Sequence, residues 1–475
     1  MRIRFLCALV GIWLLGVAGL GESEGPKSAP EEKSSLENRV WQLEEEIVEL
    51  KRVIIELREH LLGSSTARPN SNPNVEAGVS ETAREPVEGV TATKALAAQP
   101  TSDPNAMRLY WSDGIRMETA DRRVRLATGG RIMNDWNFHY GDAPGLGLDG
   151  AEFRRSRIYI LGEIGRVDFK AEYDFAGVAG PSFTDVYVGV GDIPVLGNLQ
   201  IGRFKEPFGL EQLTSSRHIT LMERSLTTTA LAPSRNMGFM FSNTMADDRF
   251  HWAAGFFKDA PLTNIAIGDG SYAFTGRVAG TPWKESGTRL LHVGAAYSHR
   301  DQELEIARFR TRPEAHLASR LVNTGFFPAD SNDRVGLEAA LVYDRFSLQT
   351  EYVNTAVDSP QSGDPSFNSF YVQGSFFLTR DARSYQSSAA AFDRVSPSSS
   401  LFNGEGGAGA WELALRYSQL DLDDGFILGG KQKNFNLGLN WYLNPNSRFM
   451  FGFVHADPEN SSSLRVLQTR FQIDF

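Results

Sequence analysis

The chain ends on the nine residues LQTRFQIDF (467–475), and these residues alternate between two kinds of side chain. One face of the segment carries Leu, Thr, Phe, Ile and the terminal Phe475, and the other carries Gln, Arg, Gln and Asp. Successive side chains of a β-strand point to opposite sides, so this period of two predicts a strand. Its faces are unusually distinct, because one is aromatic and the other is strongly polar.

The same alternation recurs upstream at 131–140, 167–175 and 346–352. A soluble sandwich also alternates, but its polar face meets bulk water and its apolar face forms a core. The many aromatic residues on the apolar faces instead favour a membrane barrel, whose girdles of aromatic residues lie at the lipid interfaces. Only a closed barrel lets strands cross lipid, since every backbone group must be paired.

We therefore predict an all-β transmembrane barrel of about 16 antiparallel strands over residues 107–475. The range follows from roughly 10 residues per strand plus turns and loops, which allows about 14 to 18 strands. A barrel of this size holds water, and the polar strand faces would line that passage.

The N-terminus predicts an exported protein. Arg2 and Arg4 precede the apolar run Phe5 to Leu20, and Gly21 follows, which is the layout of a signal peptide over residues 1–21. The alternative is a membrane anchor, although the run is shorter than the roughly 20 residues that a spanning helix needs. Cys7 is the single cysteine and would leave with the signal, so the mature chain would have no thiol chemistry.

Three further segments precede the predicted barrel. Residues 22–35 are short and polar, residues 36–62 carry a heptad repeat, and residues 63–106 form a linker rich in Ser, Pro, Thr and Ala. The seam runs Leu36, Val40, Leu43, Ile47, Leu50, Ile54, Leu57 and Leu61. It predicts a coiled coil, with a single amphipathic helix as the alternative. β-Branched residues alternating with Leu favour two strands.

Charge and motifs limit the function. The formal net charge is -10, which excludes a basic nucleic-acid binder by bulk charge. Neither a metal-ligand spacing of the His residues nor a local Ser–His–acid motif is present, so we expect no cofactor, no metal and no enzyme activity. The basic run FRTRPE (309–314) predicts a loop that either recruits anions or is a solvated turn.

Several long motifs resemble the phosphate-selective porin O and P family. They are GGRIMNDWNF (129–138), EFRRSRIYILGEIG (152–165), FKAEYDFA (169–176), IGRFKEPFGLEQLTSSRHITLMERSL (201–226), GAWELALRYSQLDL (409–422) and LGLNWYLNPNSR (437–448). The resemblance implies a sixteen-stranded, trimeric outer-membrane porin. It also implies a pore that is narrowed by infolded loops and lined by arginines that pass anions downhill. The implied trimer conflicts with the two-stranded preference of the heptads.

The resemblance assigns pore roles residue by residue. The matched positions are Arg131 of GGR, Arg154 and Arg155 of FRR, Arg203 of GRF, Arg217 of SSR, Arg224 of MER and the pore-side acid Asp185. Arg217 stands where the family has a lysine, which leaves a preference for phosphate open.

The strand register adds an independent argument. Arg131 shares a face with Asp135, and Arg155 shares one with Arg157, so all three arginines should face the lumen. Arg154 falls in the outward register, where an arginine at mid-depth costs about 2–4 kcal/mol. It must therefore lie beyond the lipid or at a β-bulge.

Arginines in a narrow pore can replace the hydration shell of an anion with several N–H donors. The sequence thus predicts an outer-membrane porin for small anions such as phosphate. Its coiled coil would lie in the periplasm and either aid oligomerisation or contact the cell wall. The alternatives are wall-bracing Arg–carboxylate pairs in a general or sugar porin, a membrane-to-wall anchor, and an outer-membrane lipase.

Overall fold

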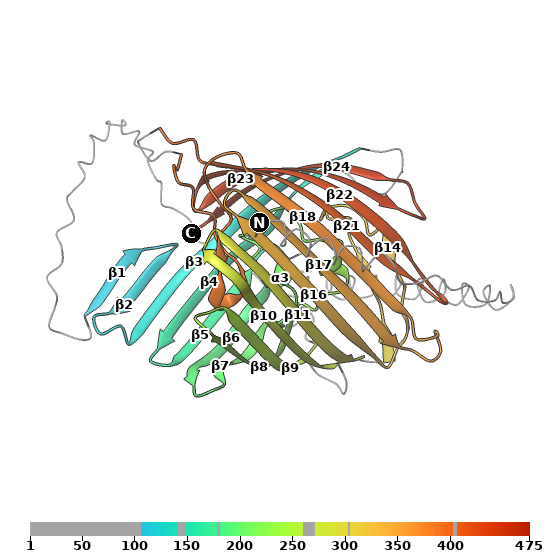
Figure 1. The fold of residues 1–475 in the computed structure, drawn as a ribbon, viewed down its shortest axis with the longest axis horizontal. Coiled ribbons are helices and arrows are strands. Elements are labelled where there is room, and N and C mark those ends of the chain that lie inside the picture. Colours follow the sequence, from blue (N-terminus) through green and yellow to red (C-terminus); the bar gives the residue numbers. More distant parts are fainter. Residues whose placement is uncertain (1–105, 141–148, 178–180, 260–270, 303–304, 402–405) are drawn as a thin grey trace, which may run out of the picture. The chain divides into compact units, whose positions relative to one another are not determined.

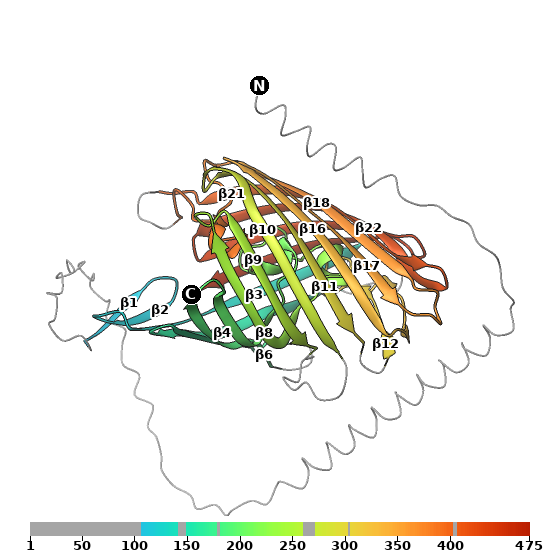
Figure 2. The ribbon, with the colours of Figure 1, turned by 60° about the horizontal axis from the view of Figure 1, so that its bottom comes forward.

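The computed structural model describes residues 106–140, 149–177, 181–259, 271–302, 305–401 and 406–475. The predicted signal peptide and coiled coil and nearly all of the linker lie outside the described residues. In the described part of the chain, sixteen antiparallel strands form a closed barrel, as predicted. They are β3 (Val124–Tyr140), β4 (Gly150–Ile164), β5 (Val167–Asp174), β6 (Ser182–Ile193), β7 (Gly197–Lys205), β8 (Arg235–Met245), β9 (Phe250–Lys258), β10 (Tyr272–Ser286), β11 (Arg289–Asp301), β16 (Ser331–Tyr343), β17 (Phe346–Asp358), β18 (Ser366–Phe377), β21 (Ala410–Asp424), β22 (Ile427–Asn444), β23 (Ser447–Pro458) and β24 (Leu464–Asp474). Figure 2 shows these strands tilted around the lumen.

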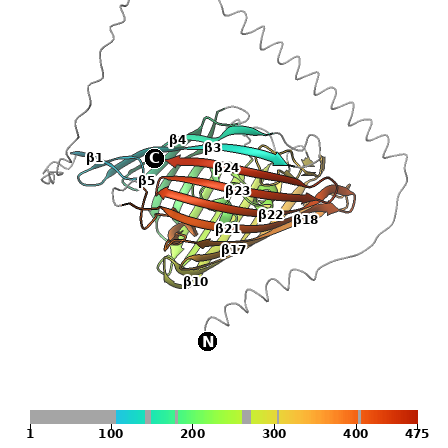
Figure 3. The same ribbon diagram turned by 90° about the horizontal axis from the view of Figure 1, so that it is seen from above.

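Pairing between the first and last of these strands closes the barrel. β24 runs antiparallel to β3, with Thr469 opposite Trp136 and Asp474 opposite Arg131, and Figure 3 shows the two strands side by side. Two backbone hydrogen bonds join the chain end to this seam: Gly130 N donates to Phe475 O (2.6 Å), and Phe475 N donates to Gly130 O (3.1 Å). Closure leaves no free sheet edge in the lipid, which is what lets strands span it.

A short hairpin extends the wall beyond the end of β24. It consists of β1 (Met107–Trp111) and β2 (Ile115–Thr119), and β2 pairs with the first residues of β3. Figure 1 shows the hairpin at one rim of the barrel, beside the C-terminus. The first residues of β3 extend beyond Phe475, where the chain ends, and β2 supplies the pairing partner that they would otherwise lack.

The alternation read from the sequence gives the wall its two faces. The side chain of Phe471 is 39% exposed on the outer surface, whereas Gln472 is 2% exposed and points inward. The buried partner of Arg470 on the inner face is Asp135, whose carboxylate accepts two hydrogen bonds of 2.6 Å from the guanidinium group. Many other inward side chains are likewise polar and hydrogen-bonded, and apolar ones such as Val353 and Leu420 pack against chain segments inside the barrel.

Three connections between strands fold into the lumen. Residues 206–234 carry α3 (Leu210–Leu213) and α4 (Leu226–Ala230), and residues 302–330 carry β12 (Ile306–Ala307), β13 (Arg310–Thr311), β14 (Val322–Asn323) and β15 (Phe327–Pro328). Residues 378–409 carry β19 (Tyr385–Gln386), η2 (Ser387–Ala389) and β20 (Ala391–Phe392). By strand direction, the first two enter from one end of the barrel, and the third enters from the opposite end.

Bonds to the inner wall hold these segments inside. Thr220 O accepts a bond from Asn440 of β22 (2.8 Å), and Arg383 donates to Gln349 of β17 (2.9 Å). Glu314 pairs with Arg416 of β21 at 2.9 Å. Among the described residues, no helix is both long and apolar enough to cross a membrane.

Because the outer face of the wall meets lipid, a charge placed on that face should destabilise the barrel more near the middle of the membrane than near its surface. Leu437 lies near the middle of β22 and is 43% exposed, whereas Leu428 lies at the hairpin end of the same strand. Leu437→Arg should lower the free energy of unfolding from lipid vesicles by about 2–4 kcal/mol, and Leu428→Arg by about 0–1 kcal/mol. Urea titration of both variants against the wild type measures the difference, and equal losses would contradict the membrane assignment of the outer face.

Candidate functional site

A cationic cavity of about 370 Å³ lies between the inner wall and the infolded segment 206–234. We call it the central chamber. Its lining contains eight basic side chains and a single carboxylate: Arg131, Arg155, Arg157, Lys170, Lys205, Arg217, Arg224, Arg235 and Asp185. The cations come from the wall strands β3, β4, β5, β7 and β8 and from the infolded segment.

Half of these cations are paired with carboxylates of the wall. Glu172 on β5 lies 2.9 Å from both Arg131 and Arg157. Asp185 on β6 lies 2.8 Å from Lys170 and 2.7 Å from Arg235. These pairs brace neighbouring strands and neutralise one another, in keeping with the wall-bracing alternative. They contribute little net charge to the chamber.

The other four cations form no salt bridge with any carboxylate of the described residues: Arg155, Lys205, Arg217 and Arg224. Lys205 Nζ instead donates to the carbonyl oxygens of Gln212, Leu213 and Thr214, at 2.6 to 3.3 Å. Arg224 likewise donates to backbone carbonyls, at 2.8 to 3.4 Å. Carbonyl oxygens orient these groups without cancelling their charge, so the chamber carries a net positive charge.

Arg217 and Arg155 are held differently from the other two. The Arg217 guanidinium lies 5.8 Å from the ring centre of Tyr159, a cation–π distance, and its Nε has no hydrogen-bond partner among the described residues. Arg155 is 5% exposed, and its Nε also lacks a partner in the described part of the chain. Unsatisfied buried donors of this kind are suited to an acceptor that comes from outside the protein.

Carboxylates anchor the segment that brings Arg217 and Arg224 into the lumen. Glu223 bonds to Arg154 (2.8 Å) and to Arg470 of β24 (2.9 Å). Burial opposes ionisation of Glu223, but Arg154 and Arg470 outweigh it and hold the pKa of this carboxyl well below its usual range. Burial lowers the pKa of Arg224 to about 10, so Arg224 remains charged at neutral pH.

A second carboxylate, Glu211, fixes the two short helices of the segment. It pairs with Arg416 of β21 at 3.1 Å and accepts hydrogen bonds from Ser225 and Thr228. Ser225 caps α4 by accepting from the backbone of Thr228. The segment is therefore tied to the wall strands β4, β21 and β24 by ion pairs.

Two further cavities adjoin the chamber and share its arginines. The outer cavity, of about 240 Å³, is lined by Arg224 together with Arg154, Arg310, Arg312 and Arg320. The inner pocket, of about 20 Å³, shares Arg217 with the central chamber. Arg224 is thus shared with the outer cavity and Arg217 with the inner pocket, and the inner pocket is the smaller of the two.

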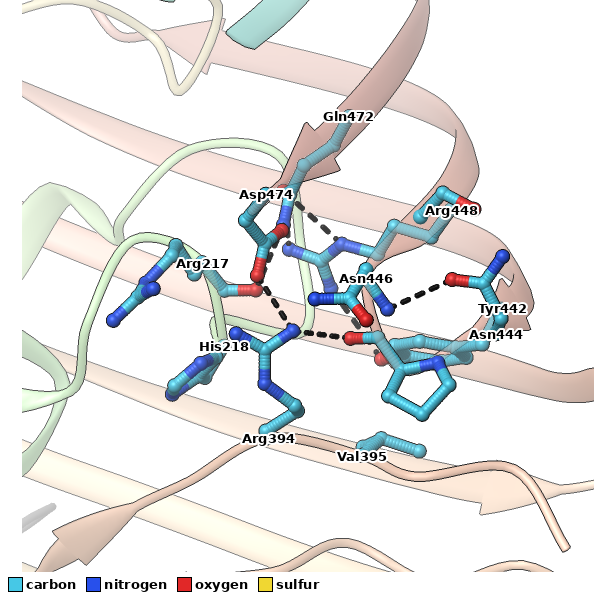
Figure 4. Close-up of a pocket in the computed structure, with 12 residues that line it drawn as sticks. Arg217, His218, Arg394, Val395, Tyr442, Asn444, Asn446, Arg448, Gln472 and Asp474 are labelled. Carbon is cyan, nitrogen blue, oxygen red and sulfur yellow. Dashed lines mark hydrogen bonds and ion pairs between the residues drawn. The ribbon is translucent and has the colours of Figure 1, made fainter. Parts of the chain in front are cut away.

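Two residues of segment 378–409, Arg394 and Val395, line the inner pocket, which Figure 4 shows. Arg394 bonds to Asp474 of β24 (2.7 Å), and His218 lies 3.3 Å from Asp393. Burial, reinforced by Arg217, lowers the pKa of His218 well below its usual range. Arg448 donates to Gln472 and Tyr442 across the pocket.

The structure brings together most of the residues that the sequence singled out. Arg131, Arg155, Arg157, Arg217, Arg224 and Asp185 all line the central chamber. Arg154 sits at a register shift between β3 and β4, so the bulge turns its side chain inward, and it lines the outer cavity. Arg203 does not line the chamber. It shares its register with Ile201, whose side chain is exposed on the outside, although Arg203 itself is buried.

Sequence reasoning missed three lining cations, Lys170, Lys205 and Arg235. Lys170 was detectable, because it shares the polar face of one strand with Asp168 and Glu172. Lys205 and Arg235 lie where strands meet the infolded segment, and no periodic signal marks such positions. The basic run 309–314 places Arg310 and Arg312 in the outer cavity.

A closed sixteen-stranded barrel with a polar, cation-rich passage defines the class of transmembrane channel proteins. The family model for phosphate-selective porin O and P matches residues 126–475, and the chain belongs to this family. It is therefore an outer-membrane porin, and the assignment points to a channel rather than an enzyme.

Individual relatives agree in length and sequence. Porin O of Pseudomonas aeruginosa is 27% identical over 410 residues, covering 77% of this chain and 90% of the relative. An uncharacterised protein of Caulobacter vibrioides is 28% identical over 494 residues, covering 97% of this chain and 96% of the relative. Among solved structures, an anion-selective porin from Comamonas acidovorans aligns with a TM-score of 0.48 at 15% identity, covering 74% of this chain and all of that one.

The Glu223 anchor predicts a pH-dependent contribution to stability. Glu223→Gln should lower the free energy of unfolding at pH 7 by about 3–5 kcal/mol, because Arg154 loses its paired carboxylate and Arg470 keeps only Asp135. A depressed pKa stabilises the fold above the ordinary value of 4.5, and this stabilisation is lost as pH falls through the folded-state pKa. The difference between wild type and variant should therefore narrow below about pH 4.

Urea titration in detergent at several pH values measures this difference. Glu285→Gln is the matched control, because Glu285 is 57% exposed and lies 3.9 Å from Arg289. A loss that is the same at all pH values, or the same in the control, would contradict the buried-pair account.

Proposed function

We propose that this porin passes small anions, phosphate among them, passively through the outer cavity, the central chamber and the inner pocket. The observation that carries the proposal is the set of four chamber cations that lack a carboxylate partner. Eight cations face the three wall carboxylates Glu172, Asp174 and Asp185, so the local charge is positive although the whole chain is acidic.

Shared lining residues support a continuous anion path. An anion in the outer cavity meets Arg224, and the same guanidinium lines the central chamber. At the far side, Arg217 lines both the chamber and the inner pocket. An ion can thus pass between neighbouring sites while it retains a cationic partner, and overlapping weak sites permit conduction rather than trapping.

A general or sugar porin is the competing function, and the wall pairs around Glu172 are compatible with it. It does not account for chamber cations held by backbone carbonyls, since desolvating an unpaired charge is costly unless an anion shares the site. The Lys205 and Arg224 arrangements therefore favour anion transport over neutral solutes.

Planar-bilayer recording in a KCl gradient tests the selectivity. The wild type should show a reversal potential on the anion side. Arg217→Gln and Arg224→Gln should each lower the chloride-to-potassium permeability ratio by about fivefold, because a unit charge at about 4 Å in water contributes about 1 kcal/mol.

Arg289→Gln is the control, since Arg289 is exposed at a strand end and paired with Asp344. A wild-type reversal potential on the cation side, or equal ratios for Arg217→Gln and Arg289→Gln, would contradict anion transport through this path.

We further propose that three copies assemble in the membrane, and that residues 36–62 form a periplasmic coiled coil that aids assembly and contacts the cell wall. The family supports three copies, and the heptad seam supports the coiled coil, although its β-branched residues favour two strands. Met107 begins the first described strand and lies at the end of the barrel that carries the short turns. In outer-membrane barrels that end faces the periplasm.

Deletion of residues 22–106 separates tethering from transport. We expect anion permeability to survive in vesicles and envelope integrity to fall in cells that produce the shortened chain. Unchanged envelope integrity would contradict the tether, and loss of channel steps in a folded barrel would show that the segment serves transport.

A further inference from the structure

An apolar patch interrupts the polar inner wall at the central chamber. The adjacent strands β6, β7 and β8 point Tyr187, Phe204 and Met240 into the chamber lining. Phe204 packs edge-on against Tyr187 and Phe257, with ring centres 6.2 and 5.6 Å apart. These side chains form one hydrophobic cluster on the lumen side, where water-facing strands ordinarily carry polar groups.

Glycines on the neighbouring strands make room for the rings. A Cβ added to Gly238 would lie 2.6 Å from a ring carbon of Phe257, and one added to Gly202 would lie 3.1 Å from the Tyr187 Cβ. Gly202 also has a φ of +138°, which side chains rarely adopt. The backbone thus lets the rings lie against the wall, and the chamber beside them remains open.

The patch borders directly on the cations. Tyr187 is the cross-strand partner of Lys170, and Lys205 follows Phe204 and pairs with Arg235 on β8. Leu213 of the infolded segment adds a further apolar group to the same lining. One side of the chamber is therefore apolar and aromatic, and cations border it.

We propose that the central chamber binds organic phosphates that carry a compact apolar body, with aryl phosphates as the simplest members. The phosphate meets Lys205, Arg217 and Arg224, and the apolar body lies on Tyr187, Phe204 and Met240. The inference rests on the proposed anion transport and names its preferred substrate class. The chamber of about 370 Å³ has the size and the mixed lining of small-molecule sites, which measure about 300–1,000 Å³.

Inorganic phosphate would use only the cationic half of this site. Burial of a phenyl ring on the apolar half removes apolar surface from water and adds binding free energy that a bare phosphate lacks. An organic phosphate should therefore occupy the chamber at lower concentrations and block chloride more strongly.

Block of the chloride current through the full-length protein in planar bilayers tests the proposal. Phenyl phosphate should reach half-block at a concentration at least about tenfold lower than inorganic phosphate, a difference of about 1.4 kcal/mol. Tyr187→Ser and Met240→Ser should each reduce this ratio to about threefold or less. Val188→Thr is the matched control, because Val188 neighbours Tyr187 but is 53% exposed on the outer face, and it should keep the ratio.

Each outcome is decisive. Equal half-blocking concentrations in the wild type, or an unchanged ratio in Met240→Ser, would overturn the organic-phosphate site while leaving anion transport intact. A cation-side reversal potential with no block by either phosphate would instead remove the proposed function itself. If Tyr187→Ser fails to fold, Met240→Ser still tests the proposal, because Met240 is half-buried and takes no part in the ring stacking.

Discussion

The structure depends on one constraint: lipid offers no partner for a backbone N–H or C=O group. A sheet can meet this demand only by closing on itself, and the pairing of β24 with β3 does so. The bonds between Gly130 and Phe475 complete the seam at the last residue of the chain. Closure also creates a lumen that lipid does not reach. Charged side chains buried there can be paired with an opposite charge or left unpaired.

The lumen contains both paired and unpaired cations. Pairs such as Arg131–Glu172 tie the wall strands together and cancel charge. By contrast, Lys205 and Arg224 are held by carbonyl oxygens, which orient a cation and leave its charge available to an anion. Glu223 forms its ion pairs with Arg154 and Arg470, neither of which lines the chamber. Positive charge is thus localised although the chain as a whole is acidic.

Periodicity made the barrel predictable. The exposures of Phe471 and Gln472 follow from alternation alone, and the register placed Arg131, Arg155 and Arg157 inside. The outward register of Arg154 pointed to a bulge or to a position beyond the lipid, and β3 and β4 show the bulge.

The rest of the site depends on contacts between distant segments, which have no local period. Segment 378–409 enters from the opposite end and meets His218 through Asp393, and nothing in either stretch indicates the other. Arg203 shows the limit of motif matching, since a residue in a matched motif can lie outside the chamber. The Tyr187 and Phe204 patch was equally hidden, because aromatic residues on a barrel strand are expected to face lipid.

Anomalous diffraction from crystals soaked in bromide tests the central claim most directly, because it locates anions without reference to currents. The account predicts bromide peaks in the central chamber, beside Lys205, Arg217 and Arg224. Bromide confined to the outer surface, or rubidium ions found in the chamber in a parallel soak, would contradict it.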